Sequence, residues 1–122
     1  MKIWSKNLLK TSLVCVIIGI TVLSLMPPKS GIELGEHDKI NHFISYTVFS
    51  LNAGMLLDNF RKHLLILPLL VLYGLLMEYC QGFVPGRAPS WLDALANTTG
   101  VSIGFVLTLI YRRLNAGLLN EN

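Results

Sequence analysis

The sequence predicts an all-α membrane protein, a bundle of four transmembrane helices with both termini in the cytoplasm. The chain of 122 residues is 52% hydrophobic. Only 14% of its residues are charged, whereas soluble domains carry about 25%. The few charges are spaced so that four long, nearly uncharged runs remain. Because only a helix satisfies every backbone N–H and C=O group of such a run in hydrocarbon, each run predicts a spanning helix.

The first helix is expected at residues 9–27. Residues 11–28 form an uncharged run of 18 positions, close to the about 20 residues that a helix needs to cross a bilayer. Lysines precede this run, as in a signal peptide, but the Met-Pro-Pro sequence at residues 26–28 offers no small-residue cleavage site. We therefore expect this helix to remain in the membrane.

Three further helices are expected at residues 39–57, 63–83 and 92–112. They contain the runs 40–57, 64–86 and 94–111, of 18, 23 and 18 residues. Only Glu78 interrupts the longest of these runs. The chain has the length of one domain, so residues 1–122 are expected to form a single integral membrane domain.

The positive charges predict the orientation. Seven lie on one predicted side, at Lys2, Lys6, Lys10, Arg61, Lys62, Arg112 and Arg113, against Lys29, Lys39 and Arg87 on the other. Because cytoplasmic loops carry the excess of Lys and Arg, both termini are expected inside a multi-pass protein of the cytoplasmic membrane. The same loops account for the net charge of +3. No basic face interleaved with aromatic residues is present, so no nucleic-acid partner is expected.

Small residues and cysteines have simple expected roles. Ala96, Gly100 and Gly104 recur every four residues, a spacing that lets another helix approach closely. This contact is expected within the chain, with a homo-oligomer as the alternative. Cys15 and Cys80 differ in expected height by roughly 15 Å, too far for a disulfide, so both are expected to be free thiols.

Ionisable and amide side chains gather at the predicted outer end of three segments. They are Asp38, Lys39, His42 and Tyr46 in the second segment, Glu78 and Gln81 in the third, and Arg87, Asp93 and Asn97 around the fourth. Residues three or four apart share a helix face, so each helix contributes one polar stripe. If these stripes turn inward, they line a pocket open to the outside, and all nine residues are candidates for ligand binding.

Glu78 is the most informative of these residues, because its expected position is about 9 Å below the membrane surface by helix rise. Ionisable residues at such depth mark functional sites by default. The alternatives are a structural ion pair with Arg87 or Lys39, or a neutral carboxyl group. For catalysis, the candidates are Glu78 and His42.

The other members have structural alternatives too. His42 could simply bond to Asp38, and Asp38 or Asp93 could cap the start of a helix. A metal held by Asp38, His42, Glu78 and Asp93 is conceivable, but no metal-binding motif selects for it and no cofactor is expected.

In these residues the chain resembles the VanZ-like family of small bacterial membrane proteins. The resemblance lies in Asp38-Lys39-x-x-His42-x-x-x-Tyr46, Glu78-x-x-Gln81, Pro85-Gly86-Arg87, Asp93, Asn97 and Gly100, in that order, and in Ser24-x-x-Pro27 at the exit of the first helix. It covers about half of the chain. The resemblance implies a multi-spanning protein of the cytoplasmic membrane, in a family named for a member that raises resistance to the glycopeptide teicoplanin.

Several functions remain open at this point. The first is an outward-facing site for a polar or anionic envelope molecule, such as the head group of a lipid-linked cell-wall precursor. In this site Arg87 and Lys39 would contact the phosphate or carboxylate group of the ligand. The second is an intramembrane acid–base enzyme acting on a lipid-linked substrate. A proton-coupled carrier is disfavoured, because no matching ionisable groups are expected in the inner half. The last is a structural or assembly protein, in which the polar residues only fix helix register.

Overall fold

The computed structural model describes residues 4–28, 36–57 and 59–120. Helix α1 spans Lys6–Leu25, α2 spans Glu36–Leu56, α3 spans Phe60–Gln81 and α4 spans Trp91–Asn120. All regular structure in these ranges is helical, which confirms the predicted all-α fold of four helices.

The helices begin earlier than the uncharged runs indicated. Three of them start three residues sooner, and in α1 and α3 a polar cap outside the apolar run sets the first turn. The hydroxyl of Ser5 accepts a hydrogen bond from the Leu8 N–H at 3.2 Å, and Asn59 accepts one from the Lys62 N–H at 3.0 Å. At its other end α4 continues eight residues beyond the predicted position 112, since charged residues end a membrane run without ending a helix.

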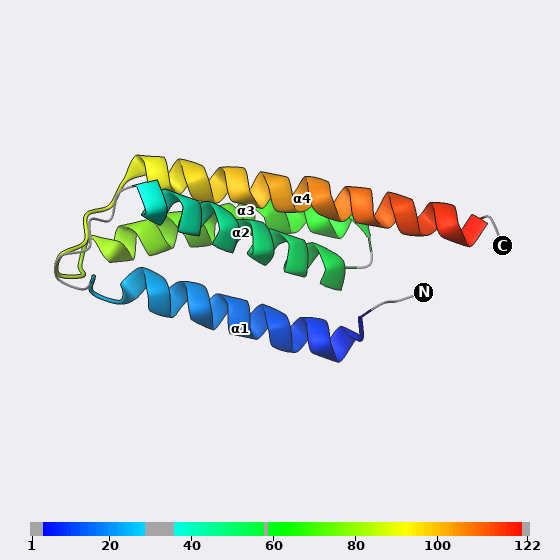
Figure 1. Cartoon of the computed structure of the whole chain (residues 1–122), viewed down its shortest axis with the longest axis horizontal. Coiled ribbons are helices and arrows are strands. Elements are labelled where there is room, and N and C mark those ends of the chain that lie inside the picture. The colour runs from blue at the N-terminus through cyan, green and yellow to red at the C-terminus, as the bar shows by residue number, and fades with distance from the viewer. Residues whose placement is uncertain (1–3, 29–35, 58, 121–122) are drawn as a thin grey trace.

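The four helices run along the long axis of the molecule (Figure 1). Helix α2 contacts each of the other three. The Lys6 end of α1 and the Asn120 end of α4 lie at one end of the bundle, and the α3–α4 connection lies at the opposite end (Figure 1). The apolar core along the bundle consists of Ile20, Tyr46, Phe49, Ala53, Leu70, Met77 and Val101.

Helices α2 and α4 approach each other closely because glycines face the contact. A Cβ atom on Gly100 would lie 2.5 Å from the carbonyl oxygen of Phe43, and one on Gly104 would lie 2.5 Å from that of Thr47. Packing within the chain therefore accounts for both glycines. A homo-oligomer formed through the stripe that includes Ala96 stays a prediction.

Three of the four helices, α1, α3 and α4, are long and apolar enough to cross a membrane. Helix α2 is not among them, because its inner face carries the polar residues from Asp38 to Ser50. The expectation that α2 also crosses the membrane stays a prediction. Both cysteines are free, with Cys15 exposed and Cys80 partly buried.

Helix α1 is attached to the bundle by few buried side chains, since only Ile20 and Ser24 are buried along its length. Polar contacts supplement them. The Asn52 amide donates to the Ser12 hydroxyl at 2.5 Å, and the hydroxyl groups of Thr21 and Tyr73 are hydrogen-bonded to each other. From Val14 onward the exposed surface of α1 is largely apolar, as expected for a helix that faces lipid.

Candidate functional site

Two neighbouring cavities of about 320 and 260 Å³ lie at the end of the bundle where α1 and α3 end and where α2 and α4 begin. Asp38, Gln81 and Arg87 line both. The larger cavity is completed by Ile20, Leu23, Ser24, Asn41, His42, Ser45 and Tyr46, and the smaller one by Lys39, Gly86, Ala88, Ser90 and Asp93. Seven of the nine candidate residues therefore line a cavity, and Glu78 and Asn97 lie behind them.

The polar stripes turn inward as their spacing indicated. On α2, His42 is 7% exposed and Tyr46 is 1% exposed. On α3 and α4, Glu78, Gln81, Asp93 and Asn97 are buried too. Because the helix ends meet at this level, the spacing of three or four residues in each helix brings side chains of three helices to one place.

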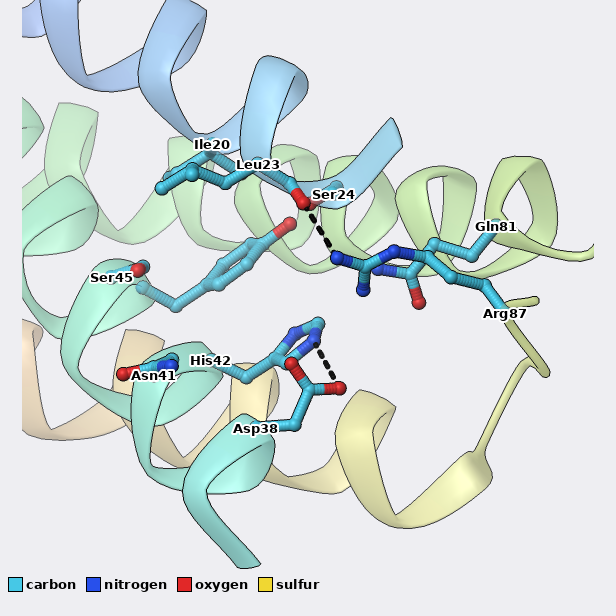
Figure 2. A pocket seen from close by; sticks show the side chains of 10 residues that line it. Ile20, Leu23, Ser24, Asp38, Asn41, His42, Ser45, Gln81 and Arg87 are labelled. Atoms are coloured by element: carbon cyan, nitrogen blue, oxygen red, sulfur yellow. Dashed lines mark hydrogen bonds and ion pairs between the residues drawn. The ribbon is translucent and has the colours of Figure 1, made fainter. Parts of the chain in front are cut away.

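His42 is the centre of this arrangement. Its Nδ1 lies 2.8 Å from the Asn97 Oδ1. Since an amide oxygen only accepts hydrogen bonds, Nδ1 carries the proton and donates it to Asn97. The Nε2 faces Asp38, whose Oδ2 lies 3.7 Å away, an ion-pair separation rather than a hydrogen bond (Figure 2).

Glu78 joins α3 to the start of α4. Its Oε2 accepts a hydrogen bond from the Ser90 N–H at 3.1 Å. Its Oε1 lies 3.7 Å from Nδ1 of His42 and is buried without a hydrogen-bond partner. Among the described residues, the ion-pair partner of Glu78 is thus His42, and neither Arg87 nor Lys39 takes that place.

Arg87 makes hydrogen bonds to the end of α1 that the sequence did not predict. Its Nε donates to the carbonyl oxygen of Met26 at 2.8 Å. Its Nη2 donates to the carbonyl oxygen of Leu23 at 2.9 Å, as Figure 2 shows. The side chain therefore ties the α3–α4 loop to the end of α1. Gly86 makes the necessary turn with a φ of +80°, a conformation that favours glycine. A guanidinium has five N–H donors, so others remain for a ligand.

The site holds more acidic than basic groups. Three carboxylates, those of Asp38, Glu78 and Asp93, face the two permanent cations Lys39 and Arg87, with His42 between them. Buried carboxylates repel one another unless a cation or a proton intervenes. An entering molecule can therefore meet positive charge on the loop side and negative charge deeper in the bundle.

A second buried polar group lies at the opposite end of the bundle and was not predicted. We call His63, Thr108 and Arg112 the closed cluster. His63 and Thr108 are 0% exposed, and Arg112 Nη2 donates to the carbonyl oxygens of Gly54, at 2.7 Å, and Leu57. The expectation that no matching ionisable groups occupy this half was therefore wrong.

A signal for the closed cluster was present in the sequence. The α4 stripe of Asp93, Asn97, Gly100 and Gly104 continues at the same spacing to Thr108 and Arg112. The charge of Arg112 led to its assignment to the cytoplasmic flank, although a long side chain can reach back into a bundle. The serines and Asn41 on the cavity wall were missed because neutral polar residues are common in membrane helices.

The fold and the site together define a class, that of helical membrane proteins with a polar cavity at one end of the bundle. Comparison with known proteins then gives the family. The family model described as VanZ/LLP1 matches residues 4–112, so the chain belongs to this family and is a VanZ-like membrane protein. The searches of curated proteins and of solved structures found no match to this chain.

Proposed function

We propose that the cavities bind the polar head group of a lipid-linked envelope molecule, such as a cell-wall precursor, at the outer face of the cytoplasmic membrane. One observation carries the proposal: polar side chains from α2, α3, α4 and the α3–α4 loop converge on the same cavities. A volume of about 320 Å³ lies at the lower end of the range for small-molecule sites.

The chemistry of the cavity walls favours a phosphate-bearing polar group attached to a lipid. Lys39 and the free N–H groups of Arg87 would contact phosphate oxygens. Asn41 and Gln81 would bond to hydroxyl or amide groups. On the α1 side, Ile20 and Leu23 make the wall largely apolar beside Ser24. Leu23 is also 61% exposed, so a lipid tail could leave along this helix.

A direct test uses the full-length protein in lipid nanodiscs and two probes with the same 15-carbon tail, a prenyl diphosphate and the corresponding alcohol. The diphosphate is expected to bind at least tenfold more tightly than the alcohol. Lys39→Gln should reduce this preference, whereas Lys62→Gln, which removes an exposed charge at the opposite end, should leave it intact. Equal binding of both probes, or equal losses in both variants, would count against the site.

The proposed orientation places the cavity outside and both termini in the cytoplasm. The excess of Lys and Arg at the end of the bundle opposite the cavity supports it. Lys2 and Lys29, two of the residues in that count, lie outside the described residues. Fusions of green fluorescent protein to either terminus should fluoresce, and fusions of alkaline phosphatase should be inactive. The reverse pattern would place the cavity in the cytoplasm.

The link to teicoplanin resistance can be tested with Glu78→Gln, Arg87→Ala and Asp93→Asn. The measurements are the abundance of each variant in the membrane and the teicoplanin susceptibility of the host. If the protein protects, protection should disappear while abundance is kept. Falling abundance in all three variants would favour the structural alternative, in which these residues only hold the helices together.

An acid–base enzyme is the second candidate, and the geometry of His42 favours it. The ring lines the cavity, and its hydrogen bond to Asn97 fixes which nitrogen is available to a substrate. Glu78 does not line either cavity, so it would act through His42 as a positioning residue. With a lipid-linked substrate, Glu78→Gln should then retain binding and lose turnover. Retained turnover would remove this candidate.

A further inference from the structure

Asp38, His42 and Asp93 bring three potential metal ligands together from two helices. One ligand atom from each lies within 4.8 Å of the others. Three ligands at about 2.1 Å around one ion lie about 3.4–3.6 Å from one another. The three side chains would thus need to move by less than about 1 Å to share an ion, a shift within reach of rotamer adjustments at a helix start.

The hydrogen bond from His42 to Asn97 prepares the ring for such a role. Because Nδ1 donates its proton to Asn97 at 2.8 Å, the neutral ring keeps a lone pair on Nε2, the nitrogen that faces Asp38. Histidines that bind metals usually hold their second nitrogen in this way, and the bond fixes both tautomer and orientation. Asn97 is itself only 2% exposed, so its position is set by packing.

Two polar side chains at this place have groups without a hydrogen-bond partner among the described residues. None of the described residues donates a hydrogen bond to the carboxylate of Asp93, although the residue is only 6% exposed. Gln81, which lines both cavities and is 2% exposed, has its Nε2 buried without a hydrogen-bond partner. A carboxylate without a donor can be satisfied by a cation, whereas the amide N–H of Gln81 is a donor and would be satisfied by an oxygen atom of water or of a ligand.

We propose that Asp38, His42 and Asp93 bind one divalent transition-metal ion, Zn²⁺ or Mn²⁺. One imidazole with two carboxylates suits these ions better than Mg²⁺ or Ca²⁺, which prefer oxygen ligands alone. The ion would offset the excess of carboxylates in the cavity. Its remaining coordination positions would face the cavity and could bind oxygen atoms of an entering head group, a role that rests on the proposed function.

The site can be tested on full-length protein without a histidine tag, treated with EDTA and reconstituted in nanodiscs without any head-group ligand. Mn²⁺ is titrated while free Mn²⁺ is followed by electron paramagnetic resonance, and Zn²⁺ is added as a competitor. We expect one saturable site per chain that Zn²⁺ displaces. Asp93→Asn and His42→Gln should each raise the dissociation constant at least tenfold, and Asn97→Ala should raise it about tenfold by releasing the ring.

His63→Gln is the matched control, because it removes a fully buried imidazole at the opposite end of the bundle and should leave the Mn²⁺ dissociation constant unchanged. If the variants of Asp93 or His42 fail to fold, Asp38→Asn gives the answer, since the side chain of Asp38 is 18% exposed at the rim. Absence of saturable binding to the wild-type chain would overturn the proposal. So would wild-type affinity in the folded cavity variants.

The proposed function is tested separately by repeating the diphosphate titration with and without EDTA. Ion binding without diphosphate binding would uphold the metal site and overturn the head-group proposal. Diphosphate binding to a chain that binds no ion would uphold the head-group proposal and overturn the metal site. A gain of at least fivefold in diphosphate affinity on adding Mn²⁺ would show that the ion takes part in recognition, and an unchanged affinity would overturn that role.

Discussion

The two ends of the bundle bury polar groups in different ways. At the cavity end, three carboxylates and a histidine surround open space. Buried atoms without a hydrogen-bond partner occur at both ends, Oε1 of Glu78 at this end and both ring nitrogens of His63 at the other. In the closed cluster, His63 packs edge-on against Phe105, with ring centroids 4.7 Å apart, and Arg112 donates to the carbonyl oxygens where α2 ends. A basic side chain at the C-terminus of a helix is a favourable structural arrangement. Burial of polar groups alone therefore does not identify a binding site.

The largest effect on the free energy of unfolding is expected from overpacking the closed cluster. A Cβ atom on Gly54 would lie 2.7 Å from both the Nε2 of His63 and the Oγ1 of Thr108. Gly54→Leu should therefore reduce the free energy of unfolding by about 3 kcal/mol or more, since overpacking of a filled interior is costly. Gly19→Leu is the control, because a Cβ at that position meets no atom within 4 Å. Titration with sodium dodecyl sulfate, followed by circular dichroism, measures both, and similar stability of the two variants would show that this end is loosely packed.

Arg112→Ala is expected to have the next largest effect. It removes the donors to the carbonyl oxygens of Gly54 and Leu57, and hydrogen bonds to a charged group contribute about 1.5–3 kcal/mol. The same titration should show a loss in that range, with no change in the binding of Mn²⁺ or diphosphate. Arg113→Ala, its exposed neighbour, should stay within about 0.5 kcal/mol of wild type. Loss of ligand binding in Arg112→Ala would mean that the two ends are coupled.

The smallest stability effect, with the opposite sign, is expected at the cavity end. Asp93→Asn removes one of three neighbouring carboxylates, so the free energy of unfolding without added metal should stay the same or rise by up to about 1 kcal/mol. Binding sites commonly cost stability in this way. Thr99→Ala, on the exposed side of α4, is the reference variant. A clear loss of stability in Asp93→Asn would make the cavity cluster structural, like the one at the other end.

The overall fold was accessible from the sequence because the constraint that produces it is local. A run without charges such as residues 94–111 predicts a helix whatever surrounds it. Helix ends were less accessible, since capping by Ser5 and Asn59 adds turns outside the apolar run. The level of the polar residues along each helix also follows from the sequence. Whether they face one another depends on how the helices are rotated, and in the structure seven of the nine candidates line the two cavities.

The partners of individual side chains depend on tertiary packing and could not be predicted. His42 lies four residues after Asp38, yet its hydrogen bond goes to Asn97 on another helix. For Glu78, an ion pair with Arg87 or Lys39 was one of the alternatives, but its hydrogen-bond donor is the Ser90 N–H just before α4. Local spacing shows which side chains share a face, whereas the rotation of neighbouring helices decides which of them meet.

The hydrogen bonds from Arg87 to the end of α1 have a consequence for how this protein can change over evolutionary time. Their acceptors are the backbone oxygens of Leu23 and Met26, which any residue at these positions supplies. Positions 23 and 26 can therefore exchange their side chains without losing the attachment, while position 87 tolerates only a side chain that donates from two nitrogens. The attachment of the α3–α4 loop to α1 thus depends on the codon for position 87, whereas the contacts of Ser12, Ile20, Thr21 and Ser24 attach the rest of α1 to the bundle.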